Sequence, residues 1–174
     1  MMPNAKPLPS LDFLENTFQL SNESSSNLIW IKPTCTKLKP GSMAGCLRKN
    51  LYWYVSFDKK QYLVHRIVYF MYHKINIDHI QIDHINQNKF DNSIFNLRIA
   101  THSQQQCNKT AKKNSTSNHK GVSWHPPLSK WRASICVNKK RMHIGYYATE
   151  LQAAVAYNTA AEKHHLNFAY LNNV

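Results

Sequence analysis

The feature that most constrains the fold is a strict two-residue alternation near the carboxyl end, in the segment KWRASICV at 130–137. Side chains of an extended strand point alternately to its two faces. The apolar side chains of this segment are Trp131, Ala133, Ile135 and Val137, and the positions between them are Lys130, Arg132, Ser134 and Cys136. The segment therefore predicts a strand with one buried face and one basic, solvated face.

A hairpin is predicted directly after this strand. NKK at 138–140 is typical of a tight turn, and the segment RMHIGYY behind it alternates again. We expect Met142 and Ile144 to point inward, and Arg141 and His143 to point outward.

A third strand and a helix complete this region. HKGVSW at 119–124 predicts the third strand, and TELQ, from Thr149 to Gln152, is a capping box that opens a helix. The helix carries several alanines, small residues that let a helix lie close to a sheet. Residues 119–174 are therefore expected to form a three-stranded antiparallel sheet packed on one helix.

The amino-terminal part of the chain has weaker signals. The polar run SNESSSN predicts a flexible leader over 1–27, and short apolar and aromatic runs from 28 to 64 predict a small β-meander. VHRIVYFMYH at 64–73 has apolar residues at helical spacing, and 94–108 has enough helix formers for a second helix. The expected fold class is α+β.

Positive charge is concentrated in the second half of the chain. Lys and Arg number 22 against 9 Asp and Glu, so the formal charge is 22 − 9 = +13. No acidic residue lies between Asp91 and Glu150. Such a stretch favours a polyanionic partner, and double-stranded DNA is the expected one. The alternatives are a solvated basic face without a partner, and RNA binding through the same face.

Composition and patterning exclude several classes of protein. No apolar run approaches the roughly 18 residues needed to cross a bilayer, and the first residues lack the apolar stretch of a secretion signal. The four cysteines, Cys35, Cys46, Cys107 and Cys136, form no C-x2-C pair. Free thiols in a reducing compartment are therefore expected, and a zinc ribbon is not. We expect an intracellular protein, located with DNA, that has neither a membrane nor an obligate protein partner.

Asp83 and His84 form the constellation best suited to chemistry, within IDHIN at 82–86. Phosphodiester hydrolysis needs a deprotonated water near the phosphorus and a cation near the leaving oxygen. Asp83 would bind a hard divalent cation through oxygen, and His84 suits a general base at neutral pH. A buried Asn can hold such a base in one tautomer by bonding its other ring nitrogen or the adjoining loop.

The residues around this pair resemble the HNH homing endonuclease family of phages and mobile introns. The likeness runs from about Leu63 to Lys109, and it is carried by V-H-R, D-H-I-N and D-N-x-x-x-N-L-R in that order. The resemblance implies a ββα-metal unit, in which two strands and a helix surround one divalent cation, Mg²⁺ or Mn²⁺. It also implies cleavage of phosphodiester bonds in DNA.

By this resemblance, Asp83 takes the position of a metal ligand, His84 that of the general base, and Asn96 that of the amide which orients the base. His65 and Arg66 match the V-H-R helix of the family. A supporting structural role is expected for these two residues rather than a catalytic one.

The chain departs from the family at the second metal ligand. That position, nine residues after the central Asn, usually holds Asn or His, and here it holds Gln105. The carbonyl oxygen of Gln105 can bind Mg²⁺, but its stem is one methylene longer, so the metal would have to move or the helix adjust. Asn108 and His102 are nearby in the sequence, and either could substitute.

The carboxyl-terminal region resembles the AP2 DNA-binding domain of the plant ERF type over about 117–172. K-G-V, K-W-R-A-x-I, I-G-Y-Y-x-T and E-x-x-A-x-A-Y-x-x-A-A occur there in order. The core positions implied by the resemblance are Trp131, Ile135, Ile144 and Tyr157. The implied DNA-facing positions are Lys120, Ser123, Lys130, Arg132, Ser134, Cys136, Arg141 and His143. Several of these are Arg or Trp in plant members, so the plant target sequence does not carry over.

The sequence thus predicts an HNH nuclease module at 28–110, joined by a basic linker at 111–118 to an AP2-like domain at 119–174 that positions it on DNA. The predicted reaction is cleavage of phosphodiester bonds with a divalent metal ion. The alternative is a catalytically decayed, sequence-specific DNA-binding or regulatory protein.

Overall fold

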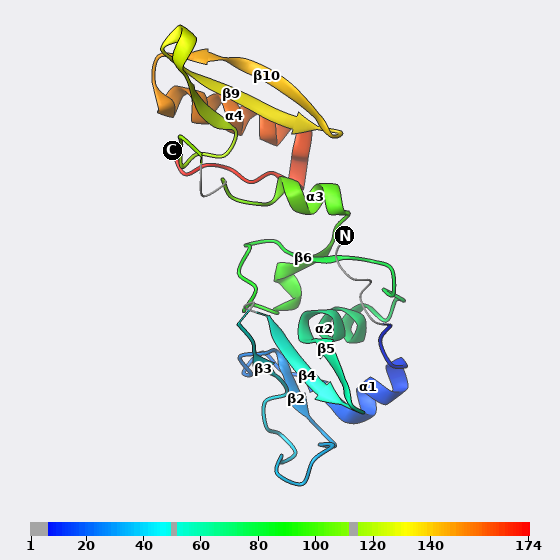
Figure 1. Cartoon of the computed structure of the whole chain (residues 1–174). Helices are drawn as coiled ribbons and strands as arrows, with labels where there is room; N and C mark the ends of the chain where they lie inside the picture. Colours follow the sequence, from blue (N-terminus) through cyan, green and yellow to red (C-terminus); the bar gives the residue numbers. More distant parts are fainter. Residues whose placement is uncertain (1–6, 50–51, 112–114) are drawn as a thin grey trace. The chain divides into compact units, whose positions relative to one another are not determined.

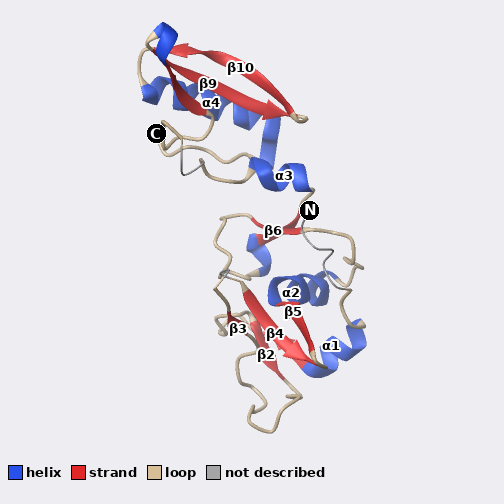
Figure 2. Ribbon diagram, viewed as in Figure 1, coloured by secondary structure: helices blue, strands red, loops and turns tan. Residues whose placement is uncertain are grey.

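In a computed structural model of the protein, residues 7–49, 52–111 and 115–174 are described. The chain divides into two compact units, Met1–Ala100 and Thr101–Val174. Both units combine short helices with small antiparallel sheets, as expected for the α+β class (Figures 1 and 2). No helix among these residues is long and apolar enough to span a bilayer.

The beginning of the first unit is folded. α1 (Leu11–Thr17) starts after Ser10, whose hydroxyl accepts a hydrogen bond from the first turn. β1 (Phe18–Leu20) follows at once and pairs antiparallel with β2 (Leu28–Trp30). Residues 1–6 of the expected leader lie outside the described part.

The expectation of a flexible leader over 1–27 is therefore wrong for α1 and the β1–β2 hairpin. Leu14 and Phe18 are buried in the core of the first unit. Ser26, within the polar run, is fully buried, and its hydroxyl donates to two backbone carbonyls. The run is typical of a loop in composition, but its hydroxyls find acceptors inside the fold, so their polarity does not require contact with solvent.

The strands that follow form the expected meander, without β2. β3 (Cys46–Leu47), β4 (Trp53–Phe57) and β5 (Lys60–Leu63) make one antiparallel sheet in that order. α2 (Val64–His73) begins directly after β5 and has the bounds that the sequence predicted. Its buried side chains share one apolar core with α1, the β1–β2 hairpin and β4.

A separate two-stranded sheet carries the Asp-His pair. β6 (Ile82–His84) pairs antiparallel with β7 (Leu97–Ile99), and the 3-10 turn η1 (Ile94–Asn96) lies directly before β7. The predicted helix over 94–108 is therefore wrong in its first half, because β7 gains hydrogen bonds to β6 that a helix there would lose. Only the second half is helical, as α3 (His102–Cys107).

The sheet and helix predicted for the second unit are present. β8 (Val122–His125), β9 (Lys130–Val137) and β10 (Lys140–Tyr147) form an antiparallel sheet in the order β10-β9-β8. α4 (Glu150–His165) lies along one face of this sheet (Figure 1). The 3-10 turn η2 (Pro126–Leu128) joins β8 to β9, and η3 (Leu166–Phe168) follows α4.

The alternation in β9 is confirmed. Ala133 and Ile135 are buried between the sheet and α4, where Ile135 packs with Tyr157. Met142 lies opposite Ile135 in the ladder, but it is 39% exposed rather than buried. We attribute this exposure to its place close to the hairpin turn, near the tip of the sheet.

The predicted turn before β10 and the predicted capping box after it are both confirmed. Asn138 and Lys139 have φ values of 51° and 64°, the left-handed conformation of a two-residue hairpin turn. α4 begins with a capping box, in which the Thr149 hydroxyl accepts from the Gln152 amide and the Gln152 side chain accepts from the Thr149 amide.

The division between the two units lies ahead of the expected linker. It falls between Ala100 and Thr101, so α3 belongs to the same unit as β8–β10 although it follows β7 directly. Residues 112–114 of the linker expected at 111–118 lie outside the described part. The compact units therefore differ from the predicted functional modules in the placement of α3.

Gly121 provides a test of how the second unit packs. Its φ is +77°, and a Cβ atom there would overlap the ring of Tyr157 on α4 and the carbonyl oxygen of Ser134. We predict that Gly121→Ala lowers the free energy of unfolding of this unit by about 3 kcal/mol, since left-handed strain and overpacking add. Gly41→Ala, with φ +80° but nothing within 4 Å, should cost about 1 kcal/mol. Urea unfolding followed by circular dichroism measures both, and equal losses would contradict the packing.

Candidate active site

The β6–β7 ladder fixes the positions of Asp83 and His84. Asp83 lies opposite Arg98, and His84 lies opposite Leu97. His84 is buried, whereas Asp83 is half-buried. Because both residues lie at the end of a short strand that belongs to a packed sheet, their backbone is fixed independently of any ligand.

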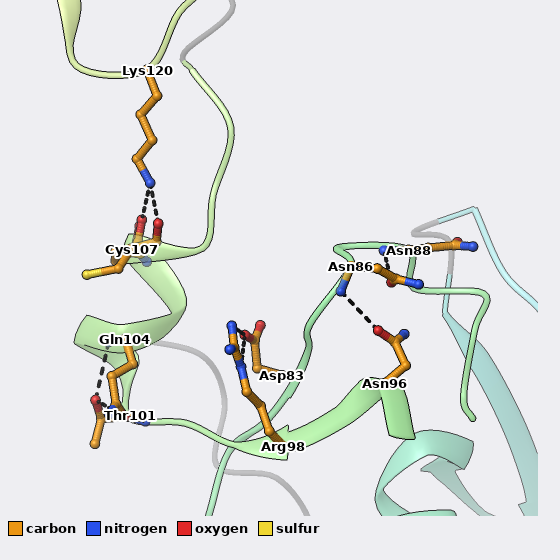
Figure 3. Close-up of polar contacts among 10 residues, drawn as sticks. Asp83, Asn86, Asn88, Asn96, Arg98, Thr101, Gln104, Cys107 and Lys120 are labelled. Atoms are coloured by element: carbon orange, nitrogen blue, oxygen red, sulfur yellow. Dashed lines mark hydrogen bonds and ion pairs between the residues drawn. The ribbon is translucent and has the colours of Figure 1, made fainter. Parts of the chain in front are cut away.

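The carboxylate of Asp83 is paired with a cation of its own sheet. Arg98 donates to Asp83 Oδ2 from Nη2 at 3.1 Å and from Nε at 3.3 Å (Figure 3). Both side chains are 15% exposed, so the pair is largely shielded from solvent. A metal ion that used Oδ2 would have to share this oxygen with the guanidinium or displace it.

The ring of His84 contacts an amide that sequence reasoning did not assign. Its Nε2 lies 3.2 Å from Oδ1 of Asn92, which is fully buried. Asn92 Nδ2 donates in turn to the backbone carbonyl of Ser26 at 3.2 Å. The D-N pair within D-N-x-x-x-N-L-R was the sequence signal that could have pointed to Asn92. Its contact with Ser26 was not expected, because Ser26 had been placed in a flexible leader.

These two hydrogen bonds assign the tautomer of His84. A carbonyl oxygen only accepts, so the Ser26 contact fixes the amide of Asn92 with its nitrogen toward Ser26 and its oxygen toward the ring. The amide oxygen also only accepts, so His84 Nε2 must carry the proton. In the neutral ring, Nδ1 is then the basic nitrogen.

Burial keeps the imidazole of His84 neutral. Burial lowers the pKa of His84, and the hydrogen bond that its Nε2 donates to Asn92 opposes this shift in part. His65, on α2, approaches the ring edge-on with centroids 5.0 Å apart. The pKa of His65 is well below its ordinary value, first because of burial and then because a proton on His65 would be repelled by a protonated His84 and by Arg66. Two neutral rings therefore pack together without repulsion.

Asn96, the residue expected to orient the base through its ring or the adjoining loop, bonds the adjoining loop. Its Oδ1 accepts from the backbone amide of Asn86 at 2.9 Å (Figure 3). Its Nδ2 donates to the carbonyl of Asp91 at 2.8 Å. Asn96 thus ties together the two ends of the loop between β6 and η1. Of the two asparagines, Asn92 is the one that contacts the His84 ring.

Arg66 supports the segment in front of β6. The side chain is buried, and its two terminal nitrogens donate to the carbonyls of Ile80 at 2.5 Å and Ile77 at 2.6 Å. These contacts fix the chain between α2 and β6. The structural role expected for Arg66 agrees with this placement.

The other predicted metal ligands, Gln105 and Asn108, belong to the second unit. α3, which carries Gln105, begins with a capping box between Thr101 and Gln104 (Figure 3). Gln105 is half-buried, and Asn108 is buried at the end of the helix. His102, considered as a substitute, lies at the start of α3, 3.3 Å from the side-chain nitrogen of Gln106.

The side chains predicted to bind metal are all oxygen donors. Among the described residues, no three His, Cys, Asp or Glu side chains gather as a metal site. The predicted ligands are one carboxylate, Asp83, and the amide oxygens of Gln105 or Asn108. Oxygen donors of this kind match Mg²⁺ or Mn²⁺, whereas zinc prefers nitrogen and sulfur.

The outward face of β8–β10 carries the predicted DNA contacts. Lys130, Cys136, Arg141 and His143 are exposed, and Ser123, Arg132 and Ser134 are half-buried. Arg132 Nη2 donates to Ser123 Oγ at 3.3 Å. A cavity of about 840 Å³ lies in the second unit, and residues of this face and of α3 line it.

Lys120 differs from the other residues in this predicted set. Its ammonium donates to the backbone carbonyls of Cys107 and Gln106 at the end of α3, rather than pointing freely into solvent. Sequence reasoning missed this contact, because nothing in the sequence pairs the turn before β8 with α3.

Comparison with known proteins bears on the segment that carries the Asp-His pair. Residues 62–107, which include α2, β6, β7 and α3, match a family described as HNH endonuclease. The chain is 37% identical over 122 residues to a mimivirus protein, "Uncharacterized HNH endonuclease L560" of Acanthamoeba polyphaga mimivirus. It is also 32% identical over 85 residues to Protein 3.8 of Escherichia phage T7.

These alignments cover only part of each protein. The first covers 69% of this chain and 62% of the mimivirus protein, and the second covers 48% of this chain and 69% of the phage protein. No solved structure matches the chain. The matched segment contains both Asp83 and His84. The chain therefore contains a domain of the HNH endonuclease family.

Proposed function

We propose that this chain is a homing-type DNA endonuclease that cleaves phosphodiester bonds with a divalent metal ion. The observation that carries the proposal is the chain of hydrogen bonds from Ser26 through Asn92 to His84, next to Asp83. It presents a neutral imidazole of fixed tautomer one residue from a carboxylate on the same strand, and metal-assisted hydrolysis uses a base and a carboxylate of these kinds.

His84 is the general base in this proposal. Its Nδ1 takes a proton from a water molecule, and the oxygen of that water attacks the phosphorus as the bond to the 3′ oxygen breaks. The 3′ oxygen leaves with the bonding electrons and is protonated by solvent, while His84 later releases its proton. Asn92 holds the ring through Nε2 during these steps, so the ring presents Nδ1 throughout.

Asp83 would hold the cation, with Gln105 or Asn108 as further oxygen ligands. When bound, a divalent ion polarises the phosphate and stabilises the charge that develops on the leaving oxygen. Arg98 neutralises Asp83 in the structure, so its guanidinium must give way or share the carboxylate. Asn96 keeps the loop after His84 in place.

The second unit would place the nuclease on double-stranded DNA through an AP2-like sheet. Lys130, Arg141 and His143 are exposed on its outward face, and this region lies within the acid-free stretch of the sequence. Antiparallel strands can enter the major groove, where basic side chains reach phosphates and guanine edges.

A DNA-binding protein with a decayed nuclease site is the second candidate. Two observations favour it: Gln105 replaces the usual ligand, and Arg98 already neutralises Asp83. Such a protein would bind DNA with a steep salt dependence and leave it uncut.

We predict that the wild-type protein nicks or linearises supercoiled plasmid in Mg²⁺ or Mn²⁺, and that EDTA stops the reaction. His84→Ala should lower the cleavage rate at least about 100-fold, because the general base is removed. His79→Ala is the matched control, since His79 is exposed in the loop before β6 and should leave the rate unchanged. Intact plasmid with folded wild-type protein, or equal cutting by His84→Ala, would rule out the proposed activity.

We predict that Asn92→Leu lowers the cleavage rate about 10- to 100-fold, because the ring of His84 loses the partner that fixes it. The ¹⁵N chemical shifts of the His84 ring should show an Nε2–H tautomer in the wild type and a mixture in the variant. Asn88→Leu, in the same loop, is the control, since its side chain bonds the Phe90 amide. A wild-type ring protonated at Nδ1 would refute the assignment of the base.

Gln105→Asn separates the two candidates. If Gln105 serves as a ligand, Gln105→Leu should lower cleavage at least about tenfold, and Gln105→Asn should change it by less than about threefold. Both variants are compared with wild type at several Mg²⁺ concentrations. A large gain of cleavage with Gln105→Asn would instead show that the glutamine had impaired the site.

A further inference from the structure

The ammonium group of Lys120 is engaged inside the second unit. Nζ donates to the Cys107 carbonyl at 2.5 Å and to the Gln106 carbonyl at 3.2 Å (Figure 3). It also lies 5.6 Å from the centre of the Tyr170 ring. Burial lowers the pKa of Lys120 to about 8, as expected for an ammonium withdrawn from water.

α3 depends on contacts at its ends. It has six residues, whereas isolated helices shorter than about 12–15 residues are marginal in water. The capping box of Thr101 and Gln104 satisfies its first turn. The carbonyls of the last turn need donors as well, and a cation is favoured there by the helix dipole. Lys120 supplies both a donor and a positive charge at that end.

The backbone of Lys120 is itself held rigidly. Its amide donates to Asn172 Oδ1 at 2.6 Å, and its carbonyl accepts from Asn172 Nδ2 at 3.1 Å. Asn172 is buried and is tied to α4 through Asn158, whose side chain accepts from the Asn172 amide and donates to its carbonyl. An unbroken set of hydrogen bonds therefore runs from α4 through Lys120 to the end of α3.

We infer that Lys120 is a positioning residue that fixes α3, and with it Gln105 and Asn108, to the sheet and helix of the second unit. This inference rests on the proposed function insofar as Gln105 and Asn108 are metal ligands there. It replaces the DNA-facing role that the AP2 resemblance implies for Lys120. The residues that bind DNA and the helix that bears the amide ligands then move as one body.

A phosphate contact and a positioning contact differ in what their removal changes. Loss of a phosphate contact weakens DNA binding and reduces the salt slope of binding by about one. Loss of the Lys120 contact removes a charged donor from the Cys107 and Gln106 carbonyls of α3 and leaves the exposed cations of the sheet untouched. Its effect should therefore appear in the order of α3 and in the rate of cleavage, not in the affinity for DNA.

The test compares Lys120→Met, Lys120→Arg and Lys130→Met in the full-length chain. Lys130 is an exposed lysine on β9, so its variant is the matched loss of one charge. In hydrogen–deuterium exchange without DNA, the amides of α3 should exchange about tenfold faster in Lys120→Met than in wild type. Lys120→Arg, which keeps a cationic donor, should retain protection, and Lys130→Met should match wild type.

DNA titrations and cleavage assays complete the test. Lys120→Met should keep the wild-type salt slope and affinity while its single-turnover cleavage rate falls at least about tenfold, with Lys120→Arg restoring most of the rate. Lys130→Met should reduce the salt slope by about one. Unchanged exchange of α3 in Lys120→Met, or a loss of salt slope equal to that of Lys130→Met, would overturn the inference. If the wild type does not cleave, the proposed function fails, but exchange and salt slope still decide the role of Lys120.

Discussion

The candidate site depends on one buried amide. Asn92 bonds the Ser26 carbonyl on one side and the His84 ring on the other, and no solvent reaches it to replace either partner. An amide in this position must be satisfied by its neighbours, because an unpaired buried polar group is costly. The amino-terminal hairpin is therefore part of the site, since it supplies the carbonyl that determines which way Asn92 points.

Charge is arranged differently in the two units. The carboxylate of Asp83 is neutralised by Arg98 and the His84 ring is kept neutral by burial, so the candidate site has little net charge of its own. The second unit carries exposed cations on one sheet face, where a polyanion can bind. Lys120 is neither part of the candidate site nor one of the exposed cations, because its ammonium donates to a carbonyl at the end of α3.

Patterns with a local cause could be predicted from the sequence. The bounds of α2 follow from apolar residues at helical spacing, and the faces of β9 follow from a strict alternation. The capping box at Thr149 and the turn at 138–139 are equally local. The family segment was identified because its residue types recur in order at fixed spacings.

What could not be predicted depends on contacts between distant parts of the chain. Ser26 and Asn92 meet across 66 positions, so composition alone placed Ser26 in a flexible leader. β7 was expected to be helical. It is a strand, because its pairing with β6 outweighs the weak local preference for a helix. These long-range contacts support the central claim that His84 is a base held in one tautomer. Chemical rescue tests it most directly: cleavage by His84→Gly should be lost and then restored by added imidazole, whereas full cleavage by that variant without imidazole would contradict the account.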